Sequence, residues 1–132
     1  MARPGQHLRS LFDKEYRRAF RNLRHLPRLT YRHVIDAGAN RGAFTDAFLL
    51  LHRPERVILV EAIPELAKNL RARYSGDPRV SIVAAALSER NGEARFEINR
   101  SEASSSLLPI DPRNSEWFSR DLSVARTVQF QP

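Results

Sequence analysis

Residues 33–44 read HVIDAGANRGAF, and their pattern is the strongest signal for the fold in this sequence. An apolar pair precedes Asp36, and Gly38 and Gly42 then bracket a short turn before apolar residues resume. The order predicts a strand that ends in a carboxylate and passes through a glycine turn into a helix. Such a turn is costly, because glycine loses more conformational freedom on folding than any other residue. It is typical of a site where a ligand approaches the backbone closely.

The sequence around this turn alternates between predicted strands and helices. Near-continuous apolar runs, such as VILVE at 57–61, suit strands that are buried on both faces of a parallel sheet. Pro64 suits the start of a helix, where a missing N–H is tolerated. The predicted elements are strands at about 33–37, 57–61 and 80–87 and helices at about 42–52 and 64–76. With right-handed crossovers, this order predicts an α/β protein with a doubly wound sheet.

The flanking segments have different patterns. Upstream, apolar residues at three- and four-residue steps predict an amphipathic helix over about 6–25, stopped by Pro27, whose apolar stripe we expect to cover the sheet. Downstream, Asn91-Gly92 is a turn signal, and Ala94–Ile98 alternates as a half-exposed antiparallel strand does. The segment 101–116 is rich in serine, proline and charge, so we expect a loop there.

Composition limits the chemistry. The chain has 22 Lys and Arg against 15 Asp and Glu, a formal net charge of +7, and many of the arginines precede the first predicted strand. Such a basic segment is either the footprint of a nucleic-acid or anionic-membrane surface, or a solvated helix face. The absence of cysteine excludes disulfides and thiolate chemistry, and the four histidines have no metal-ligand spacing, so no metal site is expected. Without a long apolar run or a signal-like N-terminus, a cytoplasmic protein is predicted.

The turn and the second strand together predict a ligand site. In a βαβ unit the first turn lies at the carboxyl end of the sheet, where ligands bind, and the N–H groups of about residues 41–44 point into that crevice. Glu61 ends the second strand about 20 residues after the last glycine, where a carboxylate can accept both hydroxyls of an adenosine ribose. Ala62 and Ile63 are apolar and suited to flank a purine ring. The alternative is that Asp36 only caps the turn and that Glu61 is a solvated strand end.

The spacing of the turn favours one adenosine cofactor over another. A dinucleotide turn reads G-x-G-x-x-G, whereas this one is G-x-x-x-G with Asp36 two residues before the first glycine. A carboxylate is a poor neighbour for a pyrophosphate but a good one for a cation. S-adenosylmethionine carries both a sulfonium and an ammonium group, so the sequence favours it over NAD. A P-loop is excluded, because no Gly-Lys-Ser/Thr is present.

Four stretches in order, DAGANRGAFT, VILVEAIPE, AALSERNGEARFEI and SEASSSLL, resemble the FkbM family of S-adenosylmethionine-dependent methyltransferases over about residues 33–110. The resemblance implies a Rossmann-like class I methyltransferase fold and O-methylation of a hydroxyl on a sugar, polyketide or other small metabolite. It implies that the turn lines the methionine end of the cofactor, that Glu61 holds the ribose beside Ala62, and that Ala86 lies by the adenine. The implied turn residues are Asp36, Gly38, Ala39, Asn40 and Gly42. We divide the chain into an N-terminal basic amphipathic helix, 1–28, and a partial Rossmann-like methyltransferase domain, 29–132.

The chain departs from the family after its third predicted parallel strand. Family members continue into a fourth strand with a Lys-Ile-Asp-x-Glu-Gly-type stretch, and no such stretch occurs here. We therefore expect a sheet that is truncated after the third parallel strand and a β-hairpin, that self-associates through its exposed flank and that transfers no methyl group by itself. No catalytic base can be named, since His33 and His52 lie at the wrong ends of their elements. The alternative function is a basic nucleic-acid-binding module or an RNA methyltransferase.

Overall fold

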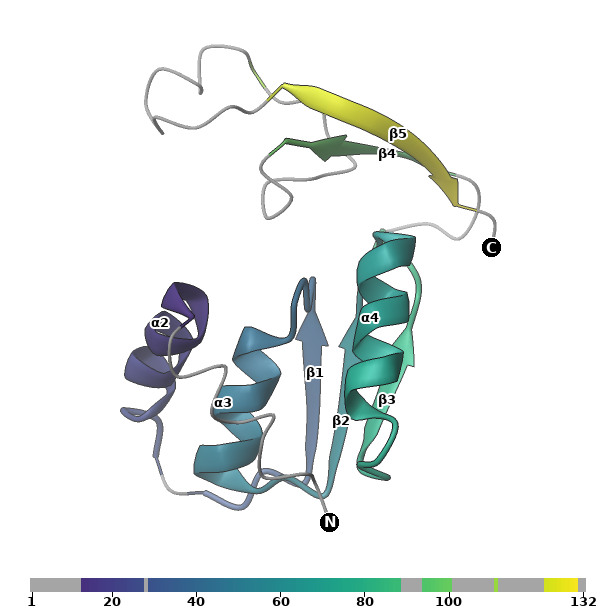
Figure 1. Cartoon of the computed structure of the whole chain (residues 1–132). Coiled ribbons are helices and arrows are strands. Elements are labelled where there is room, and N and C mark those ends of the chain that lie inside the picture. The colour runs from purple at the N-terminus through teal and green to yellow at the C-terminus, as the bar shows by residue number, and fades with distance from the viewer. Residues whose placement is uncertain (1–12, 28, 89–93, 101–110, 112–122, 131–132) are drawn as a thin grey trace. The chain divides into compact units, whose positions relative to one another are not determined.

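The computed structural model describes residues 13–27, 29–88, 94–100, 111 and 123–130. These residues belong to two compact units, Met1–Ala84 and Ala85–Pro132. Figure 1 shows the elements of both units. Among the described residues, no helix is both long and apolar enough to cross a membrane.

The first unit is built on a parallel sheet of three strands in the order β1-β2-β3. The strands are β1 at His33–Ala37, β2 at Arg56–Val60 and β3 at Val80–Val83. Helix α3, Ala43–His52, connects the first two strands, and helix α4, Pro64–Tyr74, connects the second and third (Figure 1). The parallel pairing and the helical connections confirm the predicted α/β, Rossmann-like architecture.

Strand β3 is shorter than predicted. The apolar run continues to Leu87, but the strand ends at Val83, whose carbonyl accepts a hydrogen bond from the Glu61 N–H at 3.0 Å. Strand β2 itself ends at Val60, and the chain then turns into helix α4. Residues after Val83 therefore have no backbone partner in β2, so apolar composition alone overestimated the length of the strand.

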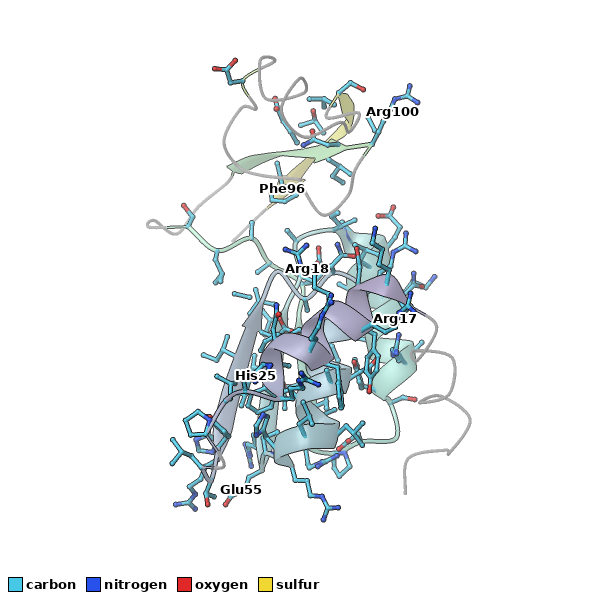
Figure 2. All side chains as sticks on the ribbon, turned by 90° about the vertical axis from the view of Figure 1, so that its left-hand side faces the viewer. Arg17, Arg18, His25, Glu55, Phe96 and Arg100 are labelled. Atoms are coloured by element: carbon cyan, nitrogen blue, oxygen red, sulfur yellow. The ribbon has the colours of Figure 1, made fainter. Side chains whose placement is uncertain are left out.

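Helix α2, Lys14–Leu23, packs on helix α3. It begins at Asp13, whose carboxylate accepts a hydrogen bond from the Glu15 N–H at 2.7 Å, as an N-cap does. Its buried residues, Tyr16 and Leu23, lie in a cluster with Ala47 and Phe48 of α3, and Val34 of β1 packs against the same cluster. Figure 2 views the side chains from the side of this helix. The apolar stripe thus covers α3 and part of β1; residues 6–12 of the predicted helix lie outside the described residues.

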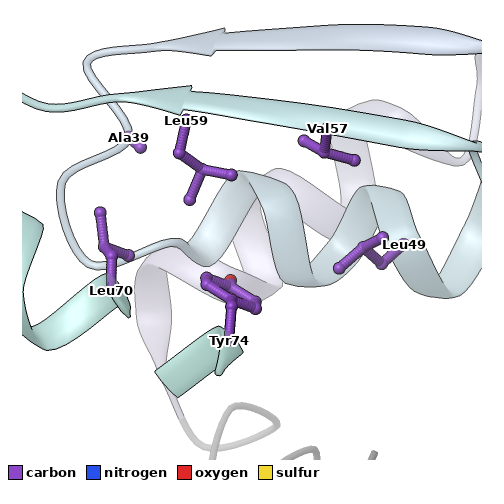
Figure 3. Packing of buried hydrophobic residues seen from close by; sticks show 6 residues of the cluster. All are labelled: Ala39, Leu49, Val57, Leu59, Leu70 and Tyr74. Carbon is purple, nitrogen blue, oxygen red and sulfur yellow. The ribbon is translucent and has the colours of Figure 1, made fainter. Parts of the chain in front are cut away.

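The main core lies between β2 and the two crossover helices. Val57 and Leu59 point from β2 toward Leu49 of α3 and toward Leu70 and Tyr74 of α4 (Figure 3). Ala39, from the glycine turn, closes the cluster at one end. The turn is therefore attached directly to the best-packed part of the unit.

The opposite face of the sheet is exposed. Because side chains alternate along a strand, Ile35, Ile58 and Val83 point away from the core, and they are 66%, 38% and 45% exposed. The apolar runs predict burial of both faces, whereas the described helices cover one. This difference follows from where α2, α3 and α4 pack and not from the strands themselves.

The second unit contains an antiparallel pair, β4 at Ala94–Asn99 and β5 at Val124–Phe130, with an irregularity at Ile98 and Asn99. The alternating pattern predicted β4, and Phe96 and Ile98 of this strand are buried. The pairing confirms the predicted antiparallel strand, but its partner β5 follows more than twenty residues later, so the two strands do not form the expected tight β-hairpin, and β5 was not located from the sequence. The predicted turn at Asn91-Gly92 lies outside the described residues, as does the predicted loop at 101–116 apart from Asp111.

Candidate functional site

The glycine turn is held against the end of β2 by its backbone. The N–H groups of Gly38 and Ala39 donate to the carbonyl of Val60, at 2.9 and 3.1 Å. Gly38, Asn40 and Gly42 have φ angles of 76°, 50° and 81°, in the left-handed region that L side chains rarely adopt. The turn therefore lies at the carboxyl ends of β1 and β2, the edge at which ligands bind in open α/β sheets.

Gly42 is required for space as well as for its backbone angle. A Cβ atom at this position would lie 2.6 Å from the Tyr74 hydroxyl and 3.0 Å from a methyl group of Leu70. At Gly38, by contrast, a Cβ atom would meet nothing within 4 Å. The two glycines thus differ: Gly38 serves the turn geometry alone, and Gly42 also allows α4 to pack against the start of α3.

Glu61 connects the turn to the end of β2. Its side chain is buried, with Oε2 accepting the Asn40 N–H at 2.6 Å and Oε1 accepting the Ile63 N–H at 2.8 Å. Each carboxylate oxygen can accept a second hydrogen bond, so two acceptor positions remain for a ligand. The predicted alternative of a solvated strand end is wrong, because the residue is 5% exposed.

Asp36 is the second buried carboxylate of the site. It is 8% exposed, and its Oδ2 accepts a hydrogen bond from the Thr45 hydroxyl at 2.6 Å. Burial raises the pKa of Asp36 above its ordinary value, the bond from Thr45 opposes that rise, and the negative charge of Glu61 adds to it. Two buried acids near one another make a site that favours a cation.

Asn40 adds an acceptor to this group. Its side-chain oxygen, Oδ1, is buried and has no hydrogen-bond partner within the described part of the chain. Buried polar atoms in folded proteins are nearly always paired, so an orphan acceptor on the residue whose N–H binds Glu61 suggests a donor that a ligand would bring.

A polar network fixes the turn from the side of α4. Asp46, buried in the first turn of α3, pairs with Arg73, which also donates to the carbonyl of Arg41 at 3.2 Å. The Tyr74 hydroxyl lies 2.8 Å from Asp46 Oδ1 and 3.1 Å from the carbonyl of Gly42. Burial raises the pKa of Tyr74, and the charge of Asp46 raises it further, so the hydroxyl stays a donor. This network holds the peptide groups of the turn in place.

The sequence did not reveal Thr45, Arg73 or Tyr74 as part of the site. The one available signal was Asp46, an isolated acid in the apolar run AFTDAFLLL. Of the predicted residues, the first unit brings together all but one: Asp36, Gly38, Ala39, Asn40, Gly42, Glu61 and Ala62. Ala86 belongs to the second unit, and its role stays a prediction. Within the described ranges, no group of three or more His, Cys, Asp or Glu residues could hold a metal ion.

Comparison with known protein families gives no match, and comparison with curated proteins gives none either. Solved structures do match. One is a protein described as a methyltransferase from Haloferax volcanii, in complex with the Trm112 methyltransferase activator, with a TM-score of 0.52 and 19% identity over 69% of this chain and 40% of that one. At this identity, the likeness shows a Rossmann-like methyltransferase fold and nothing more specific.

Two further structures are similar at lower scores. M. jannaschii TYW2 in complex with AdoMet has a TM-score of 0.49 and 15% identity over 62% of this chain and 38% of that one. A protein from Pyrococcus horikoshii described as an RNA methyltransferase has a TM-score of 0.47 and 23% identity over 58% of this chain and 39% of that one. The chain thus spans about two fifths of the length of each of these three structures.

Proposed function

We propose that this chain is the cofactor-binding part of an S-adenosylmethionine-dependent methyltransferase. The observation that carries the proposal is the pair of buried carboxylates, Asp36 and Glu61, at the carboxyl ends of adjacent parallel strands. A glycine turn lies between them in the sequence, and its Asn40 N–H donates to Glu61. The methyltransferase fold of the solved neighbour supports this reading of the site.

The two carboxylates have separate roles in this proposal. The remaining acceptor positions of Glu61 receive the hydroxyls of the ribose, and the buried Ala62 and Ile63 lie beside the adenine. Asp36 and the orphan oxygen of Asn40 receive the ammonium group of the methionine end. A pyrophosphate in the same place would face the charge of Asp36, so the site disfavours a dinucleotide.

Methyl transfer of this kind depends on positioning more than on proton transfer. When bound, the cofactor supplies a methyl group that is already activated by the sulfonium. What the chain supplies is orientation: the turn and the network of Asp46, Arg73 and Tyr74 hold the binding groups in fixed places. No residue of the chain is proposed as the general base.

Two classes of methyl acceptor are supported by different observations. The FkbM-like motifs support a hydroxyl on a sugar, a polyketide or another small metabolite. The exposed arginines of helix α2 support RNA instead, because they form a basic surface on the same unit as the site.

Titration calorimetry with S-adenosylmethionine tests the proposed function. Glu61→Ala should weaken binding by about 1.5–3 kcal/mol, the range for hydrogen bonds to a charged group. Glu55→Ala is the matched control, since Glu55 is exposed and pairs with Arg32. Circular dichroism should first show that each variant is folded, because Glu61 also accepts two backbone N–H groups. Equal affinity in parent and Glu61→Ala would remove the ribose assignment.

A further inference from the structure

Helix α2 carries a row of cations on its outer face. The row follows three- and four-residue steps, so its members share one side of the helix. All are exposed, and within residues 13–27 and 29–88 none has a carboxylate in ion-pair distance. The Arg24 side chain donates to the ring of His25, at 3.2 Å. Figure 2 labels two of them on this helix. The row consists of Lys14, Arg17, Arg18 and Arg21 of the helix and of Arg24, its C-cap residue.

The opposite face of helix α2 is buried inside the unit. Tyr16 and Leu23 are buried against α3, which anchors the helix and makes the cation row a fixed surface. A helix that binds a lipid surface inserts its apolar face, and here that face is packed inside the protein. The arrangement therefore favours a ligand that binds through its charge alone.

The direction of the row relates it to the candidate site. His52, at the end of α3, lies 3.1 Å from the carbonyl of Leu23, at the end of α2. At the other end, the charge of Asp46, in the first turn of α3, adds to the burial that raises the pKa of Tyr16, in the first turn of α2. The two helices therefore run in the same direction. The first cations of the row lie at the end of the unit that carries the glycine turn.

We propose that this outer face binds the sugar-phosphate backbone of a single-stranded nucleic acid and leads it toward the glycine turn. The row spans about 15 Å at 1.5 Å per helical residue, which matches about four phosphates of one strand. The inference that a nucleic-acid strand binds here rests on the cation row alone. The assignment of the strand as the methyl acceptor rests on the proposed function.

The experiment measures fluorescence anisotropy of a labelled 12-nucleotide oligouridylate, titrated with the 132-residue chain between 50 and 200 mM salt. Neutralising about four phosphates of a single strand predicts a slope of about −3 for log K against log salt. Arg17→Gln with Arg18→Gln should weaken binding about tenfold or more and reduce the slope by about 1.4. A matched control removes the same charge elsewhere: Arg53→Gln with Arg56→Gln changes two exposed cations after the end of α3, and should stay within about twofold of the parent.

Three results would overturn the proposal: equal weakening by the two double variants, no salt dependence, or binding to phosphatidylserine vesicles without binding to the oligonucleotide. A parallel titration with an oligothymidylate identifies the type of strand. Preference for the ribose form supports RNA, and equal affinity supports recognition of the backbone of RNA or DNA.

The same variants are titrated with S-adenosylmethionine. Loss of oligonucleotide binding in Arg17→Gln with Arg18→Gln, with cofactor affinity kept, supports the docking surface. Cofactor binding that is absent even in the parent contradicts the proposed function and leaves strand binding standing.

Discussion

Asp36 is held in surroundings that oppose its charge. It is buried, its pKa is raised by that burial, and the nearby Glu61 raises it further. A group whose pKa is raised in the folded state stabilises the fold at low pH and loses that contribution as the pH rises through the folded value. Ionised Asp36 therefore lowers the stability of the free protein at neutral pH, and a bound cation would offset this loss.

The first prediction follows from this destabilising charge. Asp36→Asn removes the charge but keeps an acceptor for the Thr45 hydroxyl, so the variant should be at least as stable as the parent at neutral pH. The stability difference between Asp36→Asn and the parent should shrink as the pH falls toward the ordinary pKa of an aspartate, because Asp36 then becomes neutral as well. Affinity for S-adenosylmethionine should nevertheless fall by about 1.5–3 kcal/mol, because a charge-assisted contact is lost.

Urea denaturation at neutral and acidic pH, together with calorimetry on the same samples, measures both effects. A variant that is less stable at neutral pH and binds the cofactor as well as the parent would show that Asp36 is structural.

The two glycines of the turn make a second, paired prediction. Gly38→Ala should cost about 1–2 kcal/mol of the free energy of unfolding, which is the strain of a left-handed backbone with a Cβ atom. Gly42→Ala should cost clearly more, because the new atom would also lie 2.6 Å from the Tyr74 hydroxyl. Chemical denaturation of the two variants decides the matter, and equal losses would contradict the close packing of Tyr74 on the turn.

At the scale of elements, helix α2 is attached through a few side chains. Leu23 is 6% exposed and lies in the cluster with Phe48, so Leu23→Ala should destabilise the unit by about 2–5 kcal/mol. Phe20, which the periodicity places on the buried stripe, is only half-buried, so Phe20→Ala should cost less than the usual value for a core aromatic residue. Leu26, 38% exposed, supplies the control. If Leu23→Ala were as stable as Leu26→Ala, the helix would not be packed on α3.

The elements that the sequence predicted well are those whose signals are local. Strand β1 has the predicted bounds, and α3 starts within one residue of the predicted start, because a glycine turn separates them. Strand β3 ends early since its length depends on a partner strand, and β5 was missed since it pairs with a distant segment. For the same reason Asp36 and Glu61 were found at strand ends, whereas Thr45, Arg73 and Tyr74 join the site only through tertiary contacts.

For the whole molecule, we expect self-association through the sheet face that helices α2, α3 and α4 leave uncovered. An apolar surface on this face is formed by Ile35 of β1, Ile58 of β2 and Val83 of β3. Strand β1 also pairs on one side only within the described residues. Surfaces of this kind favour association. Sedimentation velocity should show concentration-dependent self-association that Ile35→Lys reduces. Leu50→Lys, on an exposed position of α3, should leave it unchanged, and equal effects of the two variants would contradict a role for this face.

We propose above that the glycine turn and its two buried carboxylates form a site for a cationic adenosine cofactor. Its most direct test is a calorimetric titration of the 132-residue chain with S-adenosylmethionine and, in parallel, with NAD, which shares the adenosine but carries a pyrophosphate. We predict saturable binding of one S-adenosylmethionine per chain and no measurable binding of NAD. Binding of NAD with equal or higher affinity, or no binding of S-adenosylmethionine, would show that the turn is not a site for this cofactor.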